Sequence, residues 1–121
     1  MERLTYRSVE GSKGDPYPAW LRELRGESGV YIIRDRASRE VLYVGESHTG
    51  RLYATITRHF QAWDNSQNTA GPTYWRDDVE VAVRVLCGGA CESEPEQDRL
   101  IALLDPRDNR LVPADDEPAP F

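Results

Sequence analysis

The chain has 121 residues, of which 39% are hydrophobic and 30% are charged, as expected for one soluble domain with a single modest core. The sequence contains no run of the roughly 18 consecutive apolar residues that a membrane span needs. Its N-terminus lacks the apolar segment of a secretory signal. Two cysteines cannot build a disulfide framework, so we expect a cytoplasmic protein. These features exclude a membrane protein, a disulfide scaffold and a multidomain enzyme.

The formal net charge of −6 resides in the C-terminal quarter of the chain. Residues 92–121 contain nine acidic and three basic side chains, whereas residues 1–91 contain twelve of each. Such a balance gives no general basic patch for duplex DNA. All basic residues except Lys13 are arginines, however, and the planar arginine fork suits a few defined phosphate contacts.

Residues 1–28 are predicted to form an N-terminal extension. Residues 11–16 have the composition of a loop. Residues 18–25 place their apolar side chains at helical spacing, and Gly26 is a suitable residue to end that helix.

Two short runs rich in β-branched and aromatic residues, at 29–34 and 41–45, are separated by a polar loop and predict a β-hairpin. If the hairpin folds symmetrically about Ala37, Tyr31 lies opposite Tyr43. Directly opposed residues point to the same face of a sheet, so the two rings are expected to be neighbours.

The rest of the chain alternates between predicted helices and strands. Residues 52–63 have the spacing of a helix, residues 64–73 that of a polar loop, and residues 79–86 the strict alternation of a strand. Cys87 is interpreted as the buried end of that strand. A zinc site from the two cysteines and two histidines is disfavoured, because the C-x-x-x-C spacing matches no standard zinc pattern.

A last helix is predicted to begin near Ser93, as its N-cap, and to end before Pro106. Residues 113–121, rich in proline and acidic residues, are predicted to form a disordered tail. The order of elements predicts an α+β domain over residues 29–112, with a small three-stranded, mainly antiparallel sheet flanked by helices.

Two tripeptides carry the most specific signal: Gly29-Val-Tyr31 and, after 11 residues, Tyr43-Val-Gly45. Arg51-Leu52 follows them, and Leu100-Ile101 precedes a Pro-Arg-Asp-Asn sequence at 106–109. This ordered set resembles the GIY-YIG nuclease superfamily over residues 29–109. The resemblance implies a GIY-YIG-like fold and a metal-dependent endonuclease that hydrolyses phosphodiester bonds in DNA.

The resemblance also implies roles for particular residues. Tyr31 or Tyr43 would help to activate the attacking water, Arg51 would hold the scissile phosphate, and Asn109 would buttress the site. A glutamate would bind a single Mg²⁺ or Mn²⁺ ion, since hard cations prefer oxygen ligands. A cation and an arginine fork both stabilise the charge that a phosphodiester transition state spreads over its oxygens.

The position of the expected metal-binding glutamate is occupied by Gln97. Glu96 is therefore predicted to be the catalytic metal ligand, with Glu94 as the alternative one turn earlier. His59 shares a helix face with Arg51 and is predicted to reach the site from one turn further along.

Four residues are candidate substrate contacts, and several of the site candidates also have an ordinary structural interpretation. Gly45 and Arg58 are candidate substrate-binding residues, Arg58 as a rival phosphate clamp. Trp75 beside Arg76 is a candidate for stacking on a single strand; the alternative is that Trp75 packs under the sheet. The competing structural interpretations are strand aromatics for Tyr31 and Tyr43, a half-buried residue for His59, a solvated residue for Arg58 and a turn residue for Asn109.

The alternative function is a catalytically inactive module that keeps the fold and binds nucleic acid or a protein. Gln97 and the acidic C-terminal quarter favour it. Nucleic acid, and DNA before RNA, is the expected partner of the endonuclease, and no membrane is involved in either case.

Overall fold

The computed structural model describes residues 4–11, 17–61, 63–64, 69–70 and 74–110. The main sheet contains β1 (Arg7–Ser8), β2 (Gly29–Asp35), β3 (Val41–Ser47) and β6 (Val79–Val85), and a separate pair contains β4 (Trp63–Asp64) and β5 (Thr69–Ala70). The helices are α1 (Ala19–Arg22), α2 (Leu52–Arg58) and α3 (Ala90–Leu104), followed by the 3₁₀ turn η1 (Asp108–Arg110). The predicted tail at 113–121 lies outside the described residues.

The main sheet is antiparallel throughout, with the strand order β1-β6-β2-β3. The α+β class and the antiparallel pairing are confirmed. The prediction of three strands is wrong, because β1 pairs with β6 and adds a fourth. This strand is two residues long, too short for its alternation to be recognised in a sequence. The sheet therefore has β3 as one of its edges.

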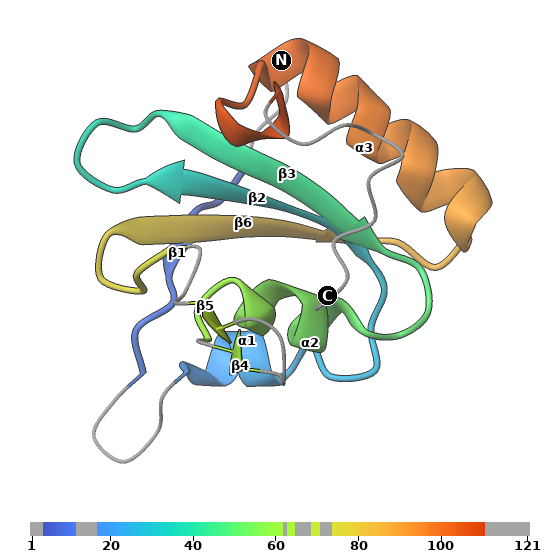
Figure 1. Ribbon diagram of the computed structural model, residues 1–121. Coiled ribbons are helices and arrows are strands. Elements are labelled where there is room, and N and C mark those ends of the chain that lie inside the picture. The colour runs from blue at the N-terminus through green and yellow to red at the C-terminus, as the bar shows by residue number, and fades with distance from the viewer. Residues whose placement is uncertain (1–3, 12–16, 62, 65–68, 71–73, 111–121) are drawn as a thin grey trace.

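Helices cover both faces of the sheet (Figure 1). One core lies on the side of α1 and α2 and includes Tyr31 and Ile33, whereas the other lies under α3 and includes Val30 and Ile32. Successive residues of a strand point to opposite faces, so β2 supplies side chains to both cores. The described part of the N-terminal extension belongs to the same body, since Val9, Tyr17 and Leu21 are buried in the first core.

The register of the hairpin differs from the symmetric one. Tyr31 pairs with Gly45, and Tyr43 pairs with Ile33. The pairing of Arg34 with Val41 centres the turn between Ala37 and Ser38, which shifts the register by one residue, and a β-bulge between Ile33 and Arg34 shifts it by one more. The two tyrosines remain on one face, with ring centroids 6.1 Å apart.

Helix α2 is shorter than predicted and ends at Arg58, with His59 as its C-cap. The Thr57 hydroxyl donates a hydrogen bond to the Tyr53 carbonyl at 2.9 Å, a bond that commonly bends or ends a helix. The Tyr74 amide then binds the His59 carbonyl at 3.0 Å. These contacts hold His59 at the end of the helix.

Helix α3 begins earlier than predicted, with Gly89 rather than Ser93 at the N-cap. The Glu92 carboxylate accepts a hydrogen bond from the Gly88 amide at 2.7 Å, and this bond stabilises the earlier start. Ser93 therefore lies inside the helix and is buried. Cys87 is exposed, which corrects its interpretation as a buried strand end, because β6 stops at Val85. The helix ends before Pro106, as predicted.

Candidate functional site

Three of the predicted site residues meet on the α2 side of the sheet: Tyr31 from β2, Tyr43 from β3 and His59 from the end of α2. The Tyr31 hydroxyl and His59 Nε2 are 2.8 Å apart and hydrogen-bonded. The His59 ring centroid lies 5.0 Å from that of Tyr43 and 5.7 Å from that of Tyr74. His59 reaches Tyr31 because α2 ends where it does.

At both glycines of the paired tripeptides, Gly29 and Gly45, a larger residue would collide with neighbouring atoms. A Cβ atom at Gly45 would lie 2.4 Å from Cζ and from the hydroxyl of Tyr31. A Cβ atom at Gly29 would lie 2.1 Å from the Arg84 carbonyl oxygen. Both distances are far inside van der Waals contact. Gly45 therefore admits the Tyr31 ring against the edge strand, and Gly29 admits the backbone of β6.

Burial sets the protonation of this cluster. It raises the pKa of the Tyr31 phenol well above its ordinary value and lowers the pKa of His59 to about 4. Burial also raises the pKa of Tyr74, whose hydroxyl donates to Asp108 Oδ2 at 2.5 Å. At neutral pH both phenols keep their protons, and the His59 imidazole is uncharged.

Asn109 holds the outer edge of β3. Its Oδ1 accepts a hydrogen bond from the Val44 amide at 2.8 Å, and its Nδ2 donates to the Val44 carbonyl at 3.0 Å. The Asn109 amide thus makes the two hydrogen bonds that a neighbouring strand would make, and it satisfies the backbone N–H and C=O of Val44 at the sheet edge. The buttressing position implied by the resemblance thus corresponds to a defined contact, one residue before Gly45.

The two candidate phosphate clamps lie at opposite ends of α2. Arg51 precedes the helix and is exposed, whereas Arg58 is its last residue and partly buried. Within the described residues, neither guanidinium makes a side-chain hydrogen bond or an ion pair. Arg58 is adjacent in sequence to His59, and Arg51 lies one helix length away.

Glu96 does not fit a metal ion. Its carboxylate binds Arg99 at 2.6 Å and Arg84 at 3.4 Å, and the Arg99 hydrogen bond chiefly lowers its pKa. These two guanidinium groups already neutralise the charge that a cation would need. Gln97, at the position of the expected glutamate, lies over β3 and donates a long hydrogen bond of 3.4 Å to the Val44 carbonyl.

Trp75 and Arg76 lie at the surface before β6. Trp75 is 62% exposed, so the alternative in which it packs under the sheet is wrong. The Arg76 guanidinium lies over the Tyr17 ring, 5.3 Å from its centroid, which is a cation–π contact. An exposed indole remains compatible with stacking on a base.

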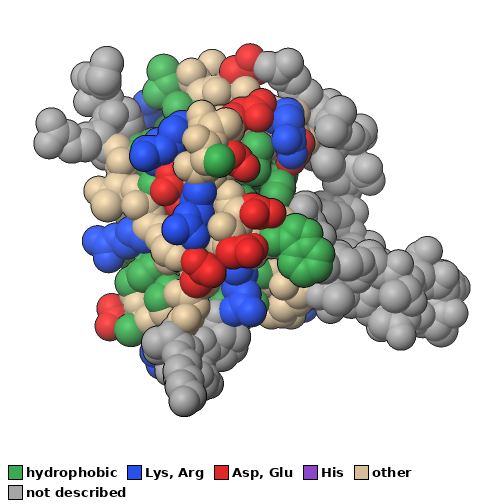
Figure 2. Space-filling view, turned by 90° about the vertical axis from the view of Figure 1, so that its left-hand side faces the viewer, with side chains coloured by type: hydrophobic (Ala, Val, Ile, Leu, Met, Phe, Trp, Pro, Cys, Tyr) green, Lys and Arg blue, Asp and Glu red, His purple; other side chains and the backbone are tan. Residues whose placement is uncertain are grey.

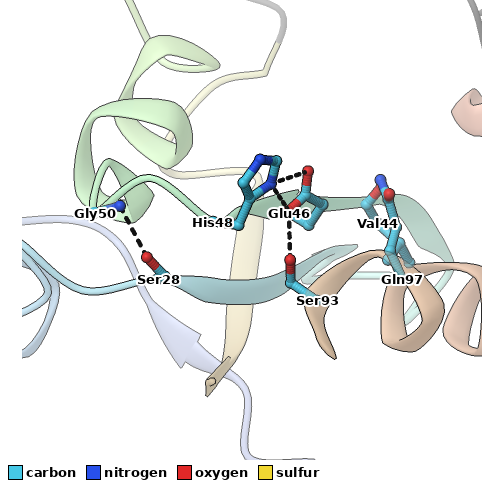
Figure 3. Close-up of polar contacts among 7 residues, drawn as sticks. All are labelled: Ser28, Val44, Glu46, His48, Gly50, Ser93 and Gln97. Carbon is cyan, nitrogen blue, oxygen red and sulfur yellow. Dashed lines mark hydrogen bonds and ion pairs between the residues drawn. The ribbon is translucent and has the colours of Figure 1, made fainter. Parts of the chain in front are cut away.

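A group of possible metal ligands that the sequence reasoning missed lies on the α3 side of β3. Oxygen or nitrogen atoms of Glu46, His48 and Glu94 all lie within 4.8 Å of one another. Glu46 accepts a hydrogen bond from the buried Ser93 hydroxyl at 2.8 Å, and its other neighbour is His48 Nδ1, at 3.0 Å (Figure 3). The only signal in the sequence is the Glu-x-His spacing directly after Gly45, which places two ligands on one side of a strand.

On the face in Figure 2, acidic and basic side chains are interspersed, with no continuous basic area. This agrees with the charge balance of residues 1–91. Among the described residues, no helix is both long enough and apolar enough to cross a membrane. Comparison of the chain with protein-family models, with curated proteins and with solved structures gave no match.

Proposed function

We propose that the chain is a divalent-metal-dependent endonuclease of the GIY-YIG type that hydrolyses phosphodiester bonds in DNA. The observation that carries the proposal is the Tyr31–His59 hydrogen bond of 2.8 Å, formed beside Tyr43 and against Gly45. It brings both tyrosines of the paired motif together with the one buried base of the cluster.

The chemistry follows from the protonation of these groups. A water molecule at the edge of β3 loses its proton to the Tyr31 hydroxyl as it attacks the phosphate. The bond from phosphorus to the leaving deoxyribose oxygen breaks as the new bond forms, and the leaving oxygen takes up a proton from solvent. Tyr31 passes its own proton to His59 Nε2, in the tautomer that carries hydrogen on Nδ1. Burial keeps the His59 imidazole neutral, with a pKa of about 4, so Nε2 has a free lone pair. The same burial disfavours the imidazolium, so the proton resides on His59 only transiently.

The transition state of the reaction also carries negative charge on the phosphate oxygens, which must be stabilised. Arg51 or Arg58 provides the bidentate fork that binds phosphate oxygens. One divalent cation, Mg²⁺ or Mn²⁺, provides further electrophilic stabilisation when bound, and Glu96 does not hold it. Asn109 keeps the edge strand in place beside Tyr31 through its two bonds to Val44.

The test is cleavage of supercoiled plasmid and of single-stranded DNA in Mg²⁺, Mn²⁺ or EDTA. Tyr31→Phe and His59→Gln are expected to lower the rate about 10²- to 10⁴-fold, the usual contribution of acid–base catalysis. Tyr53→Phe is the matched control, because Tyr53 also lies on the α2 side and contributes a ring contact with Tyr17. Equal rates for Tyr31→Phe and Tyr53→Phe would contradict the proposed role of Tyr31.

One observation favours the second candidate function, an inactive module that binds nucleic acid. Tyr31 is only 1% exposed and His59 only 4%, so their hydrogen bond also serves as a packed core contact. This candidate predicts saturable binding of a DNA fragment with no cleavage in any metal. It further predicts that His59→Gln lowers stability and leaves binding by the folded protein unchanged.

A further inference from the structure

We propose that Glu46, His48 and Glu94 form a binding site for one divalent transition-metal ion, with Mn²⁺ as its representative. This inference rests on the proposed function in one respect only: the site would supply the cation for phosphodiester hydrolysis.

The donor atoms converge as metal ligands do. A cation with bonds of about 2.1 Å holds adjacent ligand atoms about 3.0 Å apart and opposite ones about 4.2 Å apart. Glu46 Oε2 and His48 Nδ1 are 3.0 Å apart, and one ligand atom from each of the three residues lies within 4.8 Å of the other two. A small contraction, chiefly of the exposed Glu94 side chain, therefore completes the set. Two carboxylates with one imidazole favour Mn²⁺ or Zn²⁺ over Mg²⁺, which seldom takes nitrogen ligands in proteins.

The charge of this group differs from that of the nearby Glu96. Within the described residues, neither Glu46 nor Glu94 forms an ion pair with an arginine or a lysine. Glu96, by contrast, contacts both Arg84 and Arg99. Two neighbouring carboxylates that no arginine or lysine neutralises attract a cation, whereas a carboxylate already held by two guanidinium groups does not.

Two packed elements support the ligands. Glu46 lies on β3, His48 directly after it, and Glu94 on the first turns of α3, which packs on β3 through Leu100 and Val44. Ser93, itself 1% exposed, donates from its hydroxyl to Glu46 Oε2 at 2.8 Å. Such a hydrogen bond from outside the ligand set orients a metal-binding carboxylate. Figure 3 shows Ser93 and His48 approaching Glu46 from opposite sides.

The position of the site relates it to the Tyr31 cluster. Glu46 follows Gly45 directly, so its side chain lies on the α3 face of β3, whereas Tyr31 and Tyr43 lie on the α2 face. Because β3 is an edge strand, a ligand at that edge has access to both faces. A phosphate lying along the edge would meet the metal on the α3 face, with the buried Tyr31 hydroxyl behind Gly45 on the α2 face.

The experiment measures Mn²⁺ binding to the full chain by electron paramagnetic resonance and by titration calorimetry, without DNA. Glu46→Gln, His48→Gln and Glu94→Gln are each expected to weaken Mn²⁺ binding at least tenfold. Glu96→Gln is the matched control, with the same change two residues away on the same helix, and it is expected to alter the affinity less than twofold. Thermal unfolding in EDTA verifies that all four variants are folded.

The outcomes separate the site from the function. Absence of saturable Mn²⁺ binding below about 1 mM, or loss of binding in Glu96→Gln but not in Glu94→Gln, overturns the site. Binding that the three variants abolish supports the site, even if no DNA is cleaved, in which case only the proposed function fails. Metal-dependent cleavage that survives all three substitutions refutes the link between this site and hydrolysis.

Discussion

Replacement of Gly45 by alanine tests the steric basis of the Tyr31 cluster. The added Cβ would lie 2.4 Å from Tyr31 Cζ and hydroxyl and 2.7 Å from Cε1. Gly45 lies within β3 and is not among the residues with a positive φ, so the substitution strains no backbone angle. Its whole effect must come from packing. Tyr31 cannot move aside freely, because it is buried on β2 between two paired strands.

Three contributions set the expected size of the effect. Overpacking of a core costs about 1–3 kcal/mol, and displacement of the Tyr31 hydroxyl from His59 removes a hydrogen bond worth about 1 kcal/mol. Against these, alanine is better than glycine inside a strand by about 0.5–1 kcal/mol. The net loss is about 2 kcal/mol. At about 4 °C per kcal/mol for a chain of this size, the melting temperature falls by about 8 °C.

The assay is a double-mutant cycle measured by urea unfolding. Tyr31→Leu removes the atoms that meet the new Cβ, so Gly45→Ala should cost little in that background, and the coupling between the two sites should exceed about 1 kcal/mol. Equal costs of Gly45→Ala with tyrosine and with leucine at position 31 would refute the reasoning. A nuclear magnetic resonance titration of His59 gives a second readout. If Tyr31 is displaced, His59 becomes less buried, and its pKa should rise toward the ordinary value.

The other predictions concern the contacts around this cluster. Burial lowers the pKa of His59 from 6.5 to about 4, so the unfolded chain takes up a proton that the folded chain rejects in this range. Stability should therefore fall by about 3 kcal/mol as the pH drops from 6.5 to 4, and urea unfolding of His59→Gln should lack this component; an unchanged slope would contradict it. Asn109→Ala leaves the Val44 amide without its partner and should cost about 1–3 kcal/mol, with faster hydrogen exchange at that amide; unaltered exchange would exclude the contact. Tyr74→Phe removes one of the hydrogen bonds that lower the pKa of Asp108, so that carboxyl should titrate at higher pH by nuclear magnetic resonance; no change would place the hydroxyl elsewhere.

The sequence was sufficient for the elements whose signal is local. The strand at Val79–Val85 alternates over its whole length, and Tyr31 and Tyr43 were correctly expected to be neighbours. Gly26, expected to end the first helix, adopts a φ of 84° after α1. In each case, the side-chain pattern of a short segment determines the backbone.

Features that depend on tertiary contacts were not predictable in this way. The partner of Tyr31 is Gly45 rather than Tyr43, a displacement of two residues. The position of the turn accounts for one and the bulge at Ile33 for the other, and nothing in the polar loop between the strands indicates either. The end of α2 depends on the Tyr74 amide, 15 residues further along the chain than His59. Residues that cap or pair from a distance leave no periodicity in the sequence.

The candidate metal ligands also depend on tertiary contacts, so the sequence alone did not identify them. Counting along the last helix led to Glu96, since it is adjacent to the position of the expected glutamate. Neighbouring residues on a helix point about 100° apart, however, and here that rotation turns Glu96 toward Arg84 on β6. Glu94, one turn before Gln97, projects instead toward Glu46 and His48.

The arrangement of β3 explains why both candidate sites occur at one place. Its edge position leaves one side of the strand without a partner strand, and Asn109 covers that side only at Val44. The next residue, Gly45, lacks a side chain and admits the Tyr31 hydroxyl from one face. The residue after it, Glu46, turns its carboxylate to the other face beside His48. Three successive residues of β3 therefore differ in role: Val44 is bonded by Asn109, Gly45 makes room for the Tyr31 ring, and Glu46 carries a carboxylate on the opposite face. A substitution at Gly45 should therefore affect the Tyr31 cluster and leave Mn²⁺ binding at Glu46 intact.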